Sequence, residues 1–342
     1  MDTMRHLLRK LKIRQFSRSS QLRLNIVSPR PVPNMTDAIV PVRALWFSAG
    51  GQWEYTPQAP YDSKASYAPN TIPTSLTLVT WNVDFMTPYA NERLTVALDY
   101  LRFHVFPEYR GDQPPPCLIL LQEIKADAFE TLLAHPWVRA YFMVVPGSTA
   151  DGWPRGAAYG IVTLVARSTL LADSSCVHFG ETRMWRSALV TDVLLGGAEP
   201  RARVLRVVNT HLESLLEGTN RRVAQMGVIA SLLTETGTFG GIVGGDMNAI
   251  APSDETLAED NGLSDAWEHR RDGAEDGATW GYQPTDRFPP GRLDKILYTR
   301  NDDLEIRDVR RIAIGLTMPL AGGAWVSDHY GLACHVEARK NA

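Results

Sequence analysis

The stretch Gly240–Ala249, GGIVGGDMNA, joins an apolar run to an unusual ending. A short apolar run bounded by glycines is typical of a buried strand. This one ends on a carboxylate, a spacer and a carboxamide, at Asp246, Met247 and Asn248. Side chains alternate along an extended chain, so the acid and the amide project side by side while Met247 turns away. In one strand alone, an ordinary turn explains such an ending, because Asp and Asn side chains bond local backbone.

Five further segments of the chain carry the same kind of polar group at or near the end of an apolar run. They contain Asn82 and Asp84; Gln122 and Glu123; Asn209, His211, Glu213 and Ser214; Asp294; and Asp328 with His329. Burying a carboxylate without a partner costs free energy, so the repetition of carboxylates at strand ends indicates a shared functional site. We expect these ends to converge on one cleft.

The pattern of apolar residues predicts many strands and few helices. Short runs rich in β-branched residues recur from LTLVTWNV to GLACHVEA. Two helices are predicted from apolar faces: Leu94, Leu98, Leu101 and Val105 in the first, and Val223, Met226, Ala230 and Leu233 in the second. This mixture indicates an α/β sandwich, in which two packed, mainly antiparallel sheets have helices outside.

The chain divides by composition into three parts. Residues 1–35 form a basic tail whose Arg-rich, acid-poor composition fits a mitochondrial transit peptide, a disordered tail, or a nuclear-targeting arm that touches nucleic acid. Residues 36–75 are a lead-in without sustained periodicity, and residues 76–340, where the regular pattern of apolar runs lies, are predicted to form the main domain. We therefore expect a nuclear or a mitochondrial location.

The three cysteines are widely spaced and odd in number, which predicts buried free thiols in a reducing, intracellular compartment. No apolar run approaches the roughly 20 residues that a membrane span needs, so no membrane partner is expected. The formal net charge of −3 does not indicate nonspecific binding of duplex DNA, which normally needs a basic face.

The side chains at the strand ends suit a hard cation and a phosphate. Mg²⁺ prefers carboxylate oxygens, waters and substrate phosphate. Zinc is disfavoured because no Cys/His cluster has zinc-ligand spacing. The sequence contains neither a Walker A loop nor a G-x-S-x-G elbow, which disfavours nucleotide-driven phosphoryl transfer and an ordinary serine hydrolase.

Five motifs in order resemble the endonuclease/exonuclease/phosphatase family of Mg²⁺-dependent phosphoesterases. They are TWN, LQE, a histidine-bearing strand end, GDxN and SDH, spread from Trp81 to His329. The resemblance covers roughly residues 76–340. It implies a four-layered, DNase I-like sandwich and Mg²⁺ as the cofactor, with Mn²⁺ as a substitute.

The longer motifs TWNVD, LLQE, THLES, GGDMN, RLDKILY and SDHYGL resemble the tyrosyl-DNA phosphodiesterase branch of that family, which acts on 5′ ends. This branch implies hydrolysis of 5′-phosphotyrosyl-DNA bonds to leave a 5′-phosphate, as in the repair of topoisomerase-linked ends. The implied partner is single-stranded DNA with a tyrosyl adduct at its 5′ end, bound by a monomeric enzyme.

The chemistry and the resemblance together assign the metal and the base. Glu123 and Asp328 would bind Mg²⁺, with Asn82 nearby, and the cation would offset the charge of the transition state. Asp246 would be the general base that takes a proton from the attacking water. Asn248 would orient that water and bond the phosphate.

The remaining polar residues receive supporting roles. Asp84 would support the Asp246 site from behind. His329 would donate to a phosphoryl oxygen, while Asp294 bonds its other ring nitrogen and favours the imidazolium. His211 and Ser214 would be further phosphate donors.

Three residues are assigned to substrate binding. Tyr159 and Trp280 would form an apolar wall for a base or a tyrosyl ring, and Arg186 would contact a backbone phosphate. The chain departs from the branch after GDxN, where a basic residue that reaches the nucleic acid is replaced by Ile250.

That departure keeps other members of the family open as alternatives. These are a deadenylase or RNA exonuclease, an abasic endonuclease, and a small-molecule phosphatase. A sphingomyelinase is disfavoured by the absence of a signal peptide and a membrane anchor. An inactive binding module that keeps the fold is a second alternative of another class.

Overall fold

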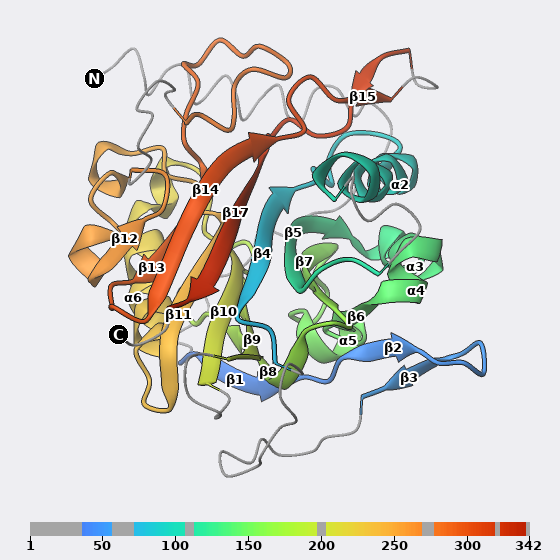
Figure 1. Ribbon diagram of the computed structural model, residues 1–342. Helices are drawn as coiled ribbons and strands as arrows, with labels where there is room; N and C mark the ends of the chain where they lie inside the picture. The colour runs from blue at the N-terminus through green and yellow to red at the C-terminus, as the bar shows by residue number, and fades with distance from the viewer. Residues whose placement is uncertain are drawn as a thin grey trace. The chain divides into compact units, whose positions relative to one another are not determined.

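Two β-sheets pack face to face at the centre of the computed structural model (Figure 1). The structure describes residues 36–56, 72–106, 113–196, 203–268, 277–318 and 322–339. The basic tail predicted at residues 1–35 lies outside these ranges. The described residues belong to one compact unit, which begins at Met35.

The first sheet has seven strands in the order β1-β8-β9-β10-β11-β13-β12. Their bounds are β1 Ala38–Pro41, β8 Leu170–His178, β9 Ser187–Leu195, β10 Arg203–His211, β11 Thr238–Asp246, β13 Asp294–Thr299 and β12 Leu263–Asp265. All neighbours pair antiparallel except β10 and β11, which are parallel.

The second sheet has eight strands in the order β14-β17-β4-β5-β7-β6-β2-β3. Their bounds are β14 Leu304–Ile312, β17 Gly331–Ala338, β4 Ser75–Asn82, β5 Cys117–Lys125, β7 Tyr159–Ala166, β6 Phe142–Val145, β2 Leu45–Phe47 and β3 Trp53–Tyr55. Here only β4 and β5 run parallel. A short ribbon of β15 (Thr317–Met318) and β16 (Ala324–Trp325) stands apart.

Each parallel pair is joined by a helix that crosses over its sheet. Helix α2 (Ala90–Tyr100) and the π-helical turn η1 (Leu101–Val105) connect β4 to β5. Helix α6 (Thr219–Leu233) connects β10 to β11. Parallel neighbours require such a crossover, so the two sheets are built alike around a β-α-β unit.

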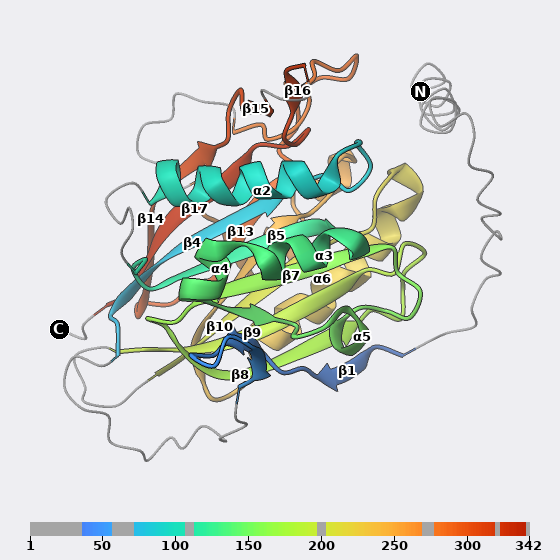
Figure 2. The same ribbon diagram turned by 90° about the vertical axis from the view of Figure 1, so that its right-hand side faces the viewer.

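Helices cover the outer faces of both sheets, which confirms the predicted α/β sandwich. Figure 2 looks onto α2, α3 (Phe129–Ala134) and α4 (Pro136–Tyr141), which lie over the eight-stranded sheet, with α5 (Thr149–Gly152) beside them. The described residues also form short 3₁₀ turns: η3 Ala126–Ala128, η4 Leu216–Gly218, η5 Pro252–Asp254 and η6 Glu259–Asn261.

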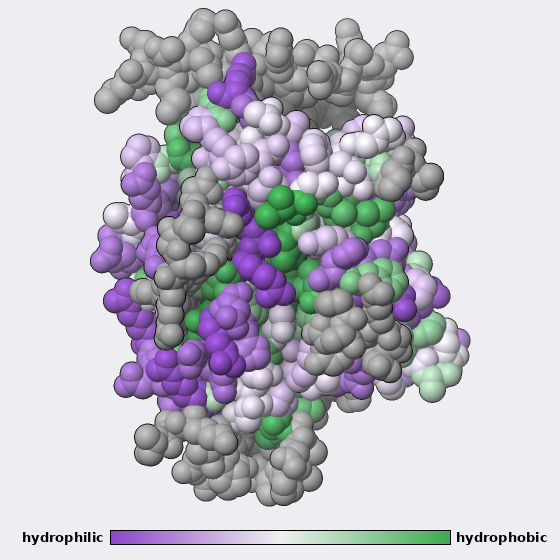
Figure 3. All heavy atoms as spheres, turned by 45° about the horizontal axis from the view of Figure 1, so that its top comes forward, coloured by the Kyte–Doolittle hydropathy of each residue, from purple (hydrophilic) through white to green (hydrophobic). Residues whose placement is uncertain are grey.

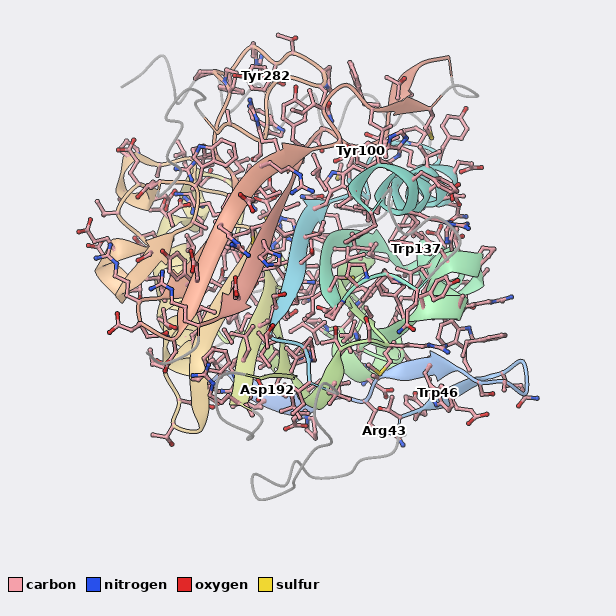
Figure 4. The ribbon with its side chains drawn as sticks, in the orientation of Figure 1. Arg43, Trp46, Tyr100, Trp137, Asp192 and Tyr282 are labelled. Carbon is pink, nitrogen blue, oxygen red and sulfur yellow. The ribbon has the colours of Figure 1, made fainter. Side chains whose placement is uncertain are left out.

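The layers enclose three large apolar clusters. One lies between the sheets and includes Leu78 and Val207. A second packs the eight-stranded sheet against its helices, where Tyr100 and Trp137 are labelled in Figure 4. The third packs α6 against the seven-stranded sheet through Met226. These layers fix the positions of the strand ends that carry the polar residues.

The paired glycines of the opening stretch are required by close packing. A Cβ added at Gly245 would lie 1.9 Å from the carbonyl oxygen of Thr210 in the neighbouring strand. At Gly244 it would lie 2.8 Å from the side chain of Leu120 in the facing sheet. The run GGIVGG is therefore the place where β11 approaches both neighbours too closely for a side chain.

The lead-in segment joins both sheets. Strand β1 pairs with β8 in the first sheet, and β2 pairs with β6 in the second. Residues 57–71 of the lead-in lie outside the described ranges. The predicted thiols, at Cys117, Cys176 and Cys334, are buried and unpaired. Among the described residues, no helix has the length and apolarity to span a membrane.

One helix face was predicted wrongly. Val223 of α6 is 48% exposed, while Arg222 and Gln225 lie on the buried face. Arg222 pairs with Asp254 at 2.6 Å, and Gln225 accepts a hydrogen bond from the backbone N–H of Glu213. Polar groups can occupy a buried face when they are fully bonded, and periodicity of apolar residues does not detect them.

Candidate active site

The polar strand ends of the two sheets meet at one end of the sandwich. Asn82 closes β4 beside Gln122 of β5, and His211 closes β10 beside Asp246 of β11. The carboxyl end of β4 lies at the top of Figure 1, and Figure 3 turns that end forward to show strongly polar side chains beside apolar ones. Both parallel pairs thus present their carboxyl ends to the same region, as ligand sites of α/β sheets commonly do.

Asp246 is buried and surrounded by hydrogen-bond donors. Its Oδ2 accepts from Asn82 Nδ2 at 3.1 Å and lies 3.3 Å from His211 Nε2. Its Oδ1 accepts from the backbone N–H of Asn248 at 2.8 Å. Burial alone would raise the pKa of this carboxyl, but His211, His329 and the Asn248 N–H together lower it below the usual range. Asp246 is therefore held as a carboxylate.

His329 and Asp294 form a buried pair. His329 Nδ1 lies 2.7 Å from Asp294 Oδ2, and the His329 backbone N–H donates to Ser327 Oγ. Burial opposes a charged ring, yet the carboxylates around it, led by Asp294, raise the pKa of His329 well above its ordinary value. The ring is an imidazolium whose Nε2–H remains 3.9 Å from Asp246 Oδ2 and from Asp328 Oδ1.

His211 is held in the opposite protonation state. Burial and the neighbouring Arg186 lower the pKa of His211 to about 4, so the ring is neutral at pH 7. Arg186 Nη1 lies 2.8 Å from His211 Nδ1, and a guanidinium can only donate. Nδ1 therefore accepts and the proton sits on Nε2, which faces Asp246 and Glu123. Arg186, which was predicted to contact a backbone phosphate, is 5% exposed and holds His211 through this contact.

Glu123 occupies a strained position in β5. Its φ is +61°, and the register with β7 shifts between Leu121 and Ile124. Such a bulge redirects a side chain out of the regular alternation. Glu123 Oε2 accepts from the backbone N–H of Phe85 at 3.0 Å. Burial, then the charges of Asp328 and other acids, raise its pKa to about 7.

Asp328 lies on the same side of the site as Glu123. Its Oδ2 accepts a hydrogen bond from Trp280 Nε1 at 3.3 Å. Trp280, which was predicted as part of an apolar wall, therefore also contacts the site through its indole N–H. Although the Asp328 side chain is 40% exposed, the protein around it desolvates the carboxyl and raises its pKa to about 6, with His329 opposing the rise and Asp84 adding to it. Two carboxyls with raised pKa values in one region indicate negative charge without a full complement of positive charge.

Asp84 supports this acidic side rather than Asp246. Its Oδ1 accepts from the backbone N–H groups of Met86 and Thr87, and its Oδ2 lies 3.5 Å from Arg93 Nη1. Only the Asp84 backbone N–H reaches toward the base, through Asn82 Oδ1 at 3.0 Å. The link from Asp84 to Asp246 therefore runs through the Asp84 backbone and the side chain of Asn82.

Arg93 was not singled out from the sequence. It is 1% exposed and donates to the carbonyls of Val83 and Val326 at 2.8 and 2.9 Å, and also to that of Asp84. The guanidinium thus ties the end of β4 to the segment that carries Asp328. The signal was present, because Arg93 lies four residues before Ala97 on the buried face of its helix.

Asn248 and Ser214 close the other side. Asn248 has φ +47°, donates through Nδ2 to the carbonyl of Leu212 at 3.0 Å, and accepts from Ser214 Oγ at 3.1 Å. The predicted pair of strand ends, GDMN and THLES, is therefore bonded together directly. Asn248 is locked in place beside Asp246.

An aromatic wall borders the histidines. Tyr159 stacks on Phe85 with ring centroids 3.7 Å apart, and the guanidinium of Arg186 lies 5.6 Å from the Tyr159 centroid. The His211 ring is 6.5 Å away. Tyr159 was predicted as part of such a wall, whereas Phe85 was missed because a phenylalanine in a loop carries no distinctive pattern.

A polar bridge joins the sheets beneath the site. Gln122 Nε2 donates to Asn209 Oδ1 at 2.8 Å and to Thr80 Oγ1 at 3.0 Å. Asn209 Nδ2 in turn donates to the carbonyl of Val162 at 3.0 Å. These residues, noted in the sequence without a role, hold the carboxyl ends of β5 and β10 at a fixed separation.

Two groups of side chains have the chemistry of metal ligands. Asp246, Asp294 and His329 place ligand atoms within 4.8 Å of one another and could hold a metal ion. A coordinating histidine must be neutral, however, and His329 is protonated and already bonded to Asp294. Glu123 and Asp328 offer hard oxygen donors with excess negative charge, which fits a divalent cation better.

Comparison with known proteins agrees with this geometry. A 5'-tyrosyl-DNA phosphodiesterase of Caenorhabditis elegans is 27% identical over 171 residues, which is 45% of each chain. The match therefore spans less than half of that relative. The crystal structure of TDP2 from C. elegans aligns with a TM-score of 0.61 and 18% identity, over 78% of this chain and 76% of that one.

Two further solved structures share the fold. D. rerio TDP2 complexed with single strand DNA product aligns with a TM-score of 0.60 and 20% identity, over 78% of this chain and all of that one. The human Nocturnin catalytic domain with bound sulfate anion aligns with a TM-score of 0.52 and 18% identity, over 78% and 94%.

The family model described as Endonuclease/Exonuclease/phosphatase family matches residues 79–329, which include every predicted site residue. This confirms both the DNase I-like sandwich and the enzymatic class expected from the motifs. The chain belongs to the endonuclease/exonuclease/phosphatase family.

Proposed function

We propose that this protein is a Mg²⁺-dependent phosphodiesterase that hydrolyses 5′-phosphotyrosyl-DNA bonds and leaves a 5′-phosphate. One observation carries the proposal: a buried, ionised Asp246 lies within reach of two histidines held in opposite protonation states. That arrangement supplies a proton acceptor beside two different N–H donors at one point. The acidic pair Glu123 and Asp328 lies next to it.

Glu123 and Asp328 are the residues that would hold Mg²⁺. A cation bound there would supply positive charge that offsets the negative charge of the transition state. The protein contributes a bulged strand that aims Glu123 outward and a loop clamped by Arg93 that presents Asp328. Mn²⁺ prefers similar oxygen ligands and is proposed as a substitute.

Asp246 is the proposed general base. Its two oxygens are bonded by Asn82 and by the backbone of Asn248, so its orientation is fixed before substrate arrives. The negatively charged phosphate that enters beside it raises its pKa, which improves it as a proton acceptor for water. Asn248 carries the amide that orients this water, held by Leu212 and Ser214.

The histidines are the proposed donors to the phosphate. The imidazolium of His329 directs Nε2–H toward the region between Asp246 and Asp328, while Asp294 fixes its other nitrogen. Neutral His211 presents Nε2–H from the opposite sheet because Arg186 occupies Nδ1. Fixed donors of this kind stabilise developing charge without reorganisation.

The nature of the leaving group rests on the motifs and on the relatives. The C. elegans relative is named a 5'-tyrosyl-DNA phosphodiesterase, and a structural neighbour was solved with single strand DNA product. In this chain, Tyr159 and Phe85 offer a stacked aromatic wall beside His211, and Trp280 lies against Asp328. Aromatic rings accept a tyrosyl ring or an unpaired base.

The test is cleavage of a single-stranded oligonucleotide that carries a 5′-phosphotyrosine. The wild-type protein and an Asp246→Asn variant are compared in Mg²⁺ and in EDTA. We expect Mg²⁺-dependent release of tyrosine and a 5′-phosphate product, and neither in the variant. Matched reactions contain an abasic duplex or a poly(A) strand.

Cleavage of the abasic duplex or of poly(A), without tyrosine release, would keep the catalytic assignments and replace the substrate. Activity of Asp246→Asn within a few-fold of wild type would remove Asp246 as the base. No hydrolysis of any substrate by the wild type would leave a binding module.

A further inference from the structure

The loop Gly180–Arg186, which leads into β9, is fixed to its surroundings at several points. The backbone N–H of Gly180 donates to Asp37 Oδ1 at 2.8 Å, and Gln225 Nε2 donates to the carbonyl of Glu181 at 2.7 Å. Thr182 Oγ1 donates to Glu213 Oε2 at 2.9 Å. Three separate parts of the chain therefore hold this loop in one conformation.

Three residues of this rigid loop are exposed, Glu181 near its start and the pair Arg183 and Trp185 at its end. Trp185 is 52% exposed although it is the largest apolar side chain of the loop, and its φ of +54° is unfavourable for a residue with a bulky side chain. Arg183 is also exposed. An exposed tryptophan held in a strained backbone beside a cation is costly for stability, which points to a use in binding.

The loop is continuous with the active site through hydrogen bonds. Arg183 N–H donates to Glu213 Oε1 at 3.0 Å, and the next residue, Ser214, donates to Asn248. On the other side, the residue after Trp185 is Arg186, which contacts His211. Arg183 and Trp185 therefore lie at the margin of the site, on the side of the histidine from the seven-stranded sheet.

We propose that Arg183 and Trp185 form a binding subsite for single-stranded nucleic acid, in which Trp185 stacks on an unpaired base and Arg183 contacts a phosphate. The proposal rests on the proposed function and specifies where the strand lies. An aromatic ring beside a cation next to a phosphodiester-cleaving centre is the combination that binds single strands without sequence preference.

Charge selects this occupant over a peptide attached to the leaving group. The segment after Asn248 carries no positive charge, since Ala249 and Ile250 follow it and Ile250 is 36% exposed. Arg183 supplies positive charge on the neighbouring segment, connected to Asn248 through Glu213 and Ser214. A polyanion gains from this arrangement, whereas a neutral peptide would gain only from Trp185.

The test measures binding of a 5′-phosphorylated, 3′-fluorescein-labelled single strand of eight nucleotides by fluorescence anisotropy in EDTA. We expect Trp185→Ala to weaken binding roughly tenfold and Trp185→Phe to restore most of it. Arg183→Ala should reduce the slope of log K against log salt by about 0.7, and Arg183→Gln should do the same. Unchanged affinity in Trp185→Ala would overturn the proposal.

An abasic scan separates stacking from misfolding. One nucleotide at a time is replaced by an abasic one, and wild type and Trp185→Ala are compared on each strand. We expect the two proteins to differ on every strand except the one that lacks the contacted base. A uniform loss on all strands, with a lowered thermal midpoint, would show a structural role and contradict the proposal.

Hydrolysis of the 4-nitrophenyl ester of thymidine 5′-phosphate distinguishes the subsite from the catalytic proposal. Trp185→Ala should leave kcat on this single-nucleotide ester unchanged while raising KM for the tyrosyl oligonucleotide. If wild type released no tyrosine, the proposed function would fail and the binding data would still decide the subsite. An effect of Trp185→Ala only on substrates with a tyrosyl peptide would assign the peptide as occupant and overturn the proposal.

Discussion

On one side of the active site the pKa of a carboxyl, Asp246, is lowered, and on the other side the pKa values of two carboxyls, Glu123 and Asp328, are raised. On the base side, Asp294 holds His329 at 2.7 Å, and Nε2 of the same ring lies 3.9 Å from Asp246. On the acidic side, Glu123 and Asp328 face each other's charge. Desolvation acts to raise the pKa of Asp246, Asp294, Glu123 and Asp328, and the neighbouring groups reverse this effect only at Asp246.

The difference shows on which side the protein's own groups compensate the charge of a carboxylate. The pKa of Asp246 is lowered because imidazole N–H groups surround it, so the base is formed without help. The pKa of Glu123 is raised to about 7 and that of Asp328 to about 6, because desolvation and the charges of neighbouring acids, Asp84 among them, outweigh the positive charge nearby. The acidic side gains most from an added cation.

The largest effect is expected when the base side is broken. Asp246→Asn keeps the shape of the side chain but removes the proton acceptor, and we expect kcat to fall by roughly 10²–10⁴. Rapid-mixing kinetics on the tyrosyl oligonucleotide would measure it. Asp192→Asn, at the opposite end of the seven-stranded sheet from this site (Figure 4), is the matched control, and a loss of equal size there would contradict the assignment.

The sequence was sufficient for the fold class and for the convergence of the strand ends. Carboxylates and amides recurring after apolar runs identified Asp246, Glu123 and Asp328 because unpaired acids are rarely placed in strands. Strand alternation was expected to set Asp246 beside Asn248, but β11 ends at Asp246, and a turn with Asn248 at φ +47° brings the backbone N–H of Asn248 to the acid. The inferences on fold class and convergence use only the local pattern of residues and the free-energy cost of burying an unpaired charge, so a single sequence is enough for them.

The sequence could not show how the site residues are paired. The contact of Arg186 with His211 depends on the packing of β9 against β10, which periodicity does not encode. The bulge at Glu123 is likewise a property of the pairing of β5 with β7. Arg222 was missed on α6 because its partner, Asp254, is 32 residues away in the chain.

Breaking the acidic side should change the metal requirement before it changes the chemistry. In Glu123→Gln we expect the half-saturating Mg²⁺ concentration to rise at least roughly tenfold, because one oxygen ligand loses its charge. Activity measured across a Mg²⁺ titration at pH 8 tests this. Glu130→Gln, on the exposed face of α3, is the control, and an unchanged titration in Glu123→Gln would remove Glu123 as a ligand.

Protons should compete with the metal on the acidic side only. Glu123 and Asp328 must be ionised to bind a cation, and their pKa values of about 7 and about 6 lie within reach of ordinary buffers. We expect the half-saturating Mg²⁺ concentration of wild type to rise roughly tenfold from pH 8 to pH 6. Glu123→Gln should show a shallower dependence, and equal slopes for the two proteins would contradict the comparison.

The smallest effect, and the sharpest comparison, is on stability without metal. A carboxyl with a raised folded pKa loses stabilising free energy as pH rises through the interval from its unfolded pKa to its folded pKa, which for Glu123 runs from 4.5 to about 7. At pH 8 in EDTA, Glu123→Gln should therefore raise the free energy of unfolding by about 1–3 kcal/mol. Asp246 has a lowered pKa, so its carboxylate stabilises the fold above its unfolded pKa, and Asp246→Asn should lower the free energy of unfolding.

Urea unfolding of both variants in EDTA would measure these shifts, and added Mg²⁺ should stabilise wild type more than Glu123→Gln because the ion binds only the folded state. If the free energy of unfolding shifted with the same sign in the two variants, Glu123 and Asp246 would not differ in how well their charges are compensated in the folded protein. Opposite signs would mean that the protein accepts a cost at Glu123 which the cation removes, while the base at Asp246 is stabilised by the fold itself.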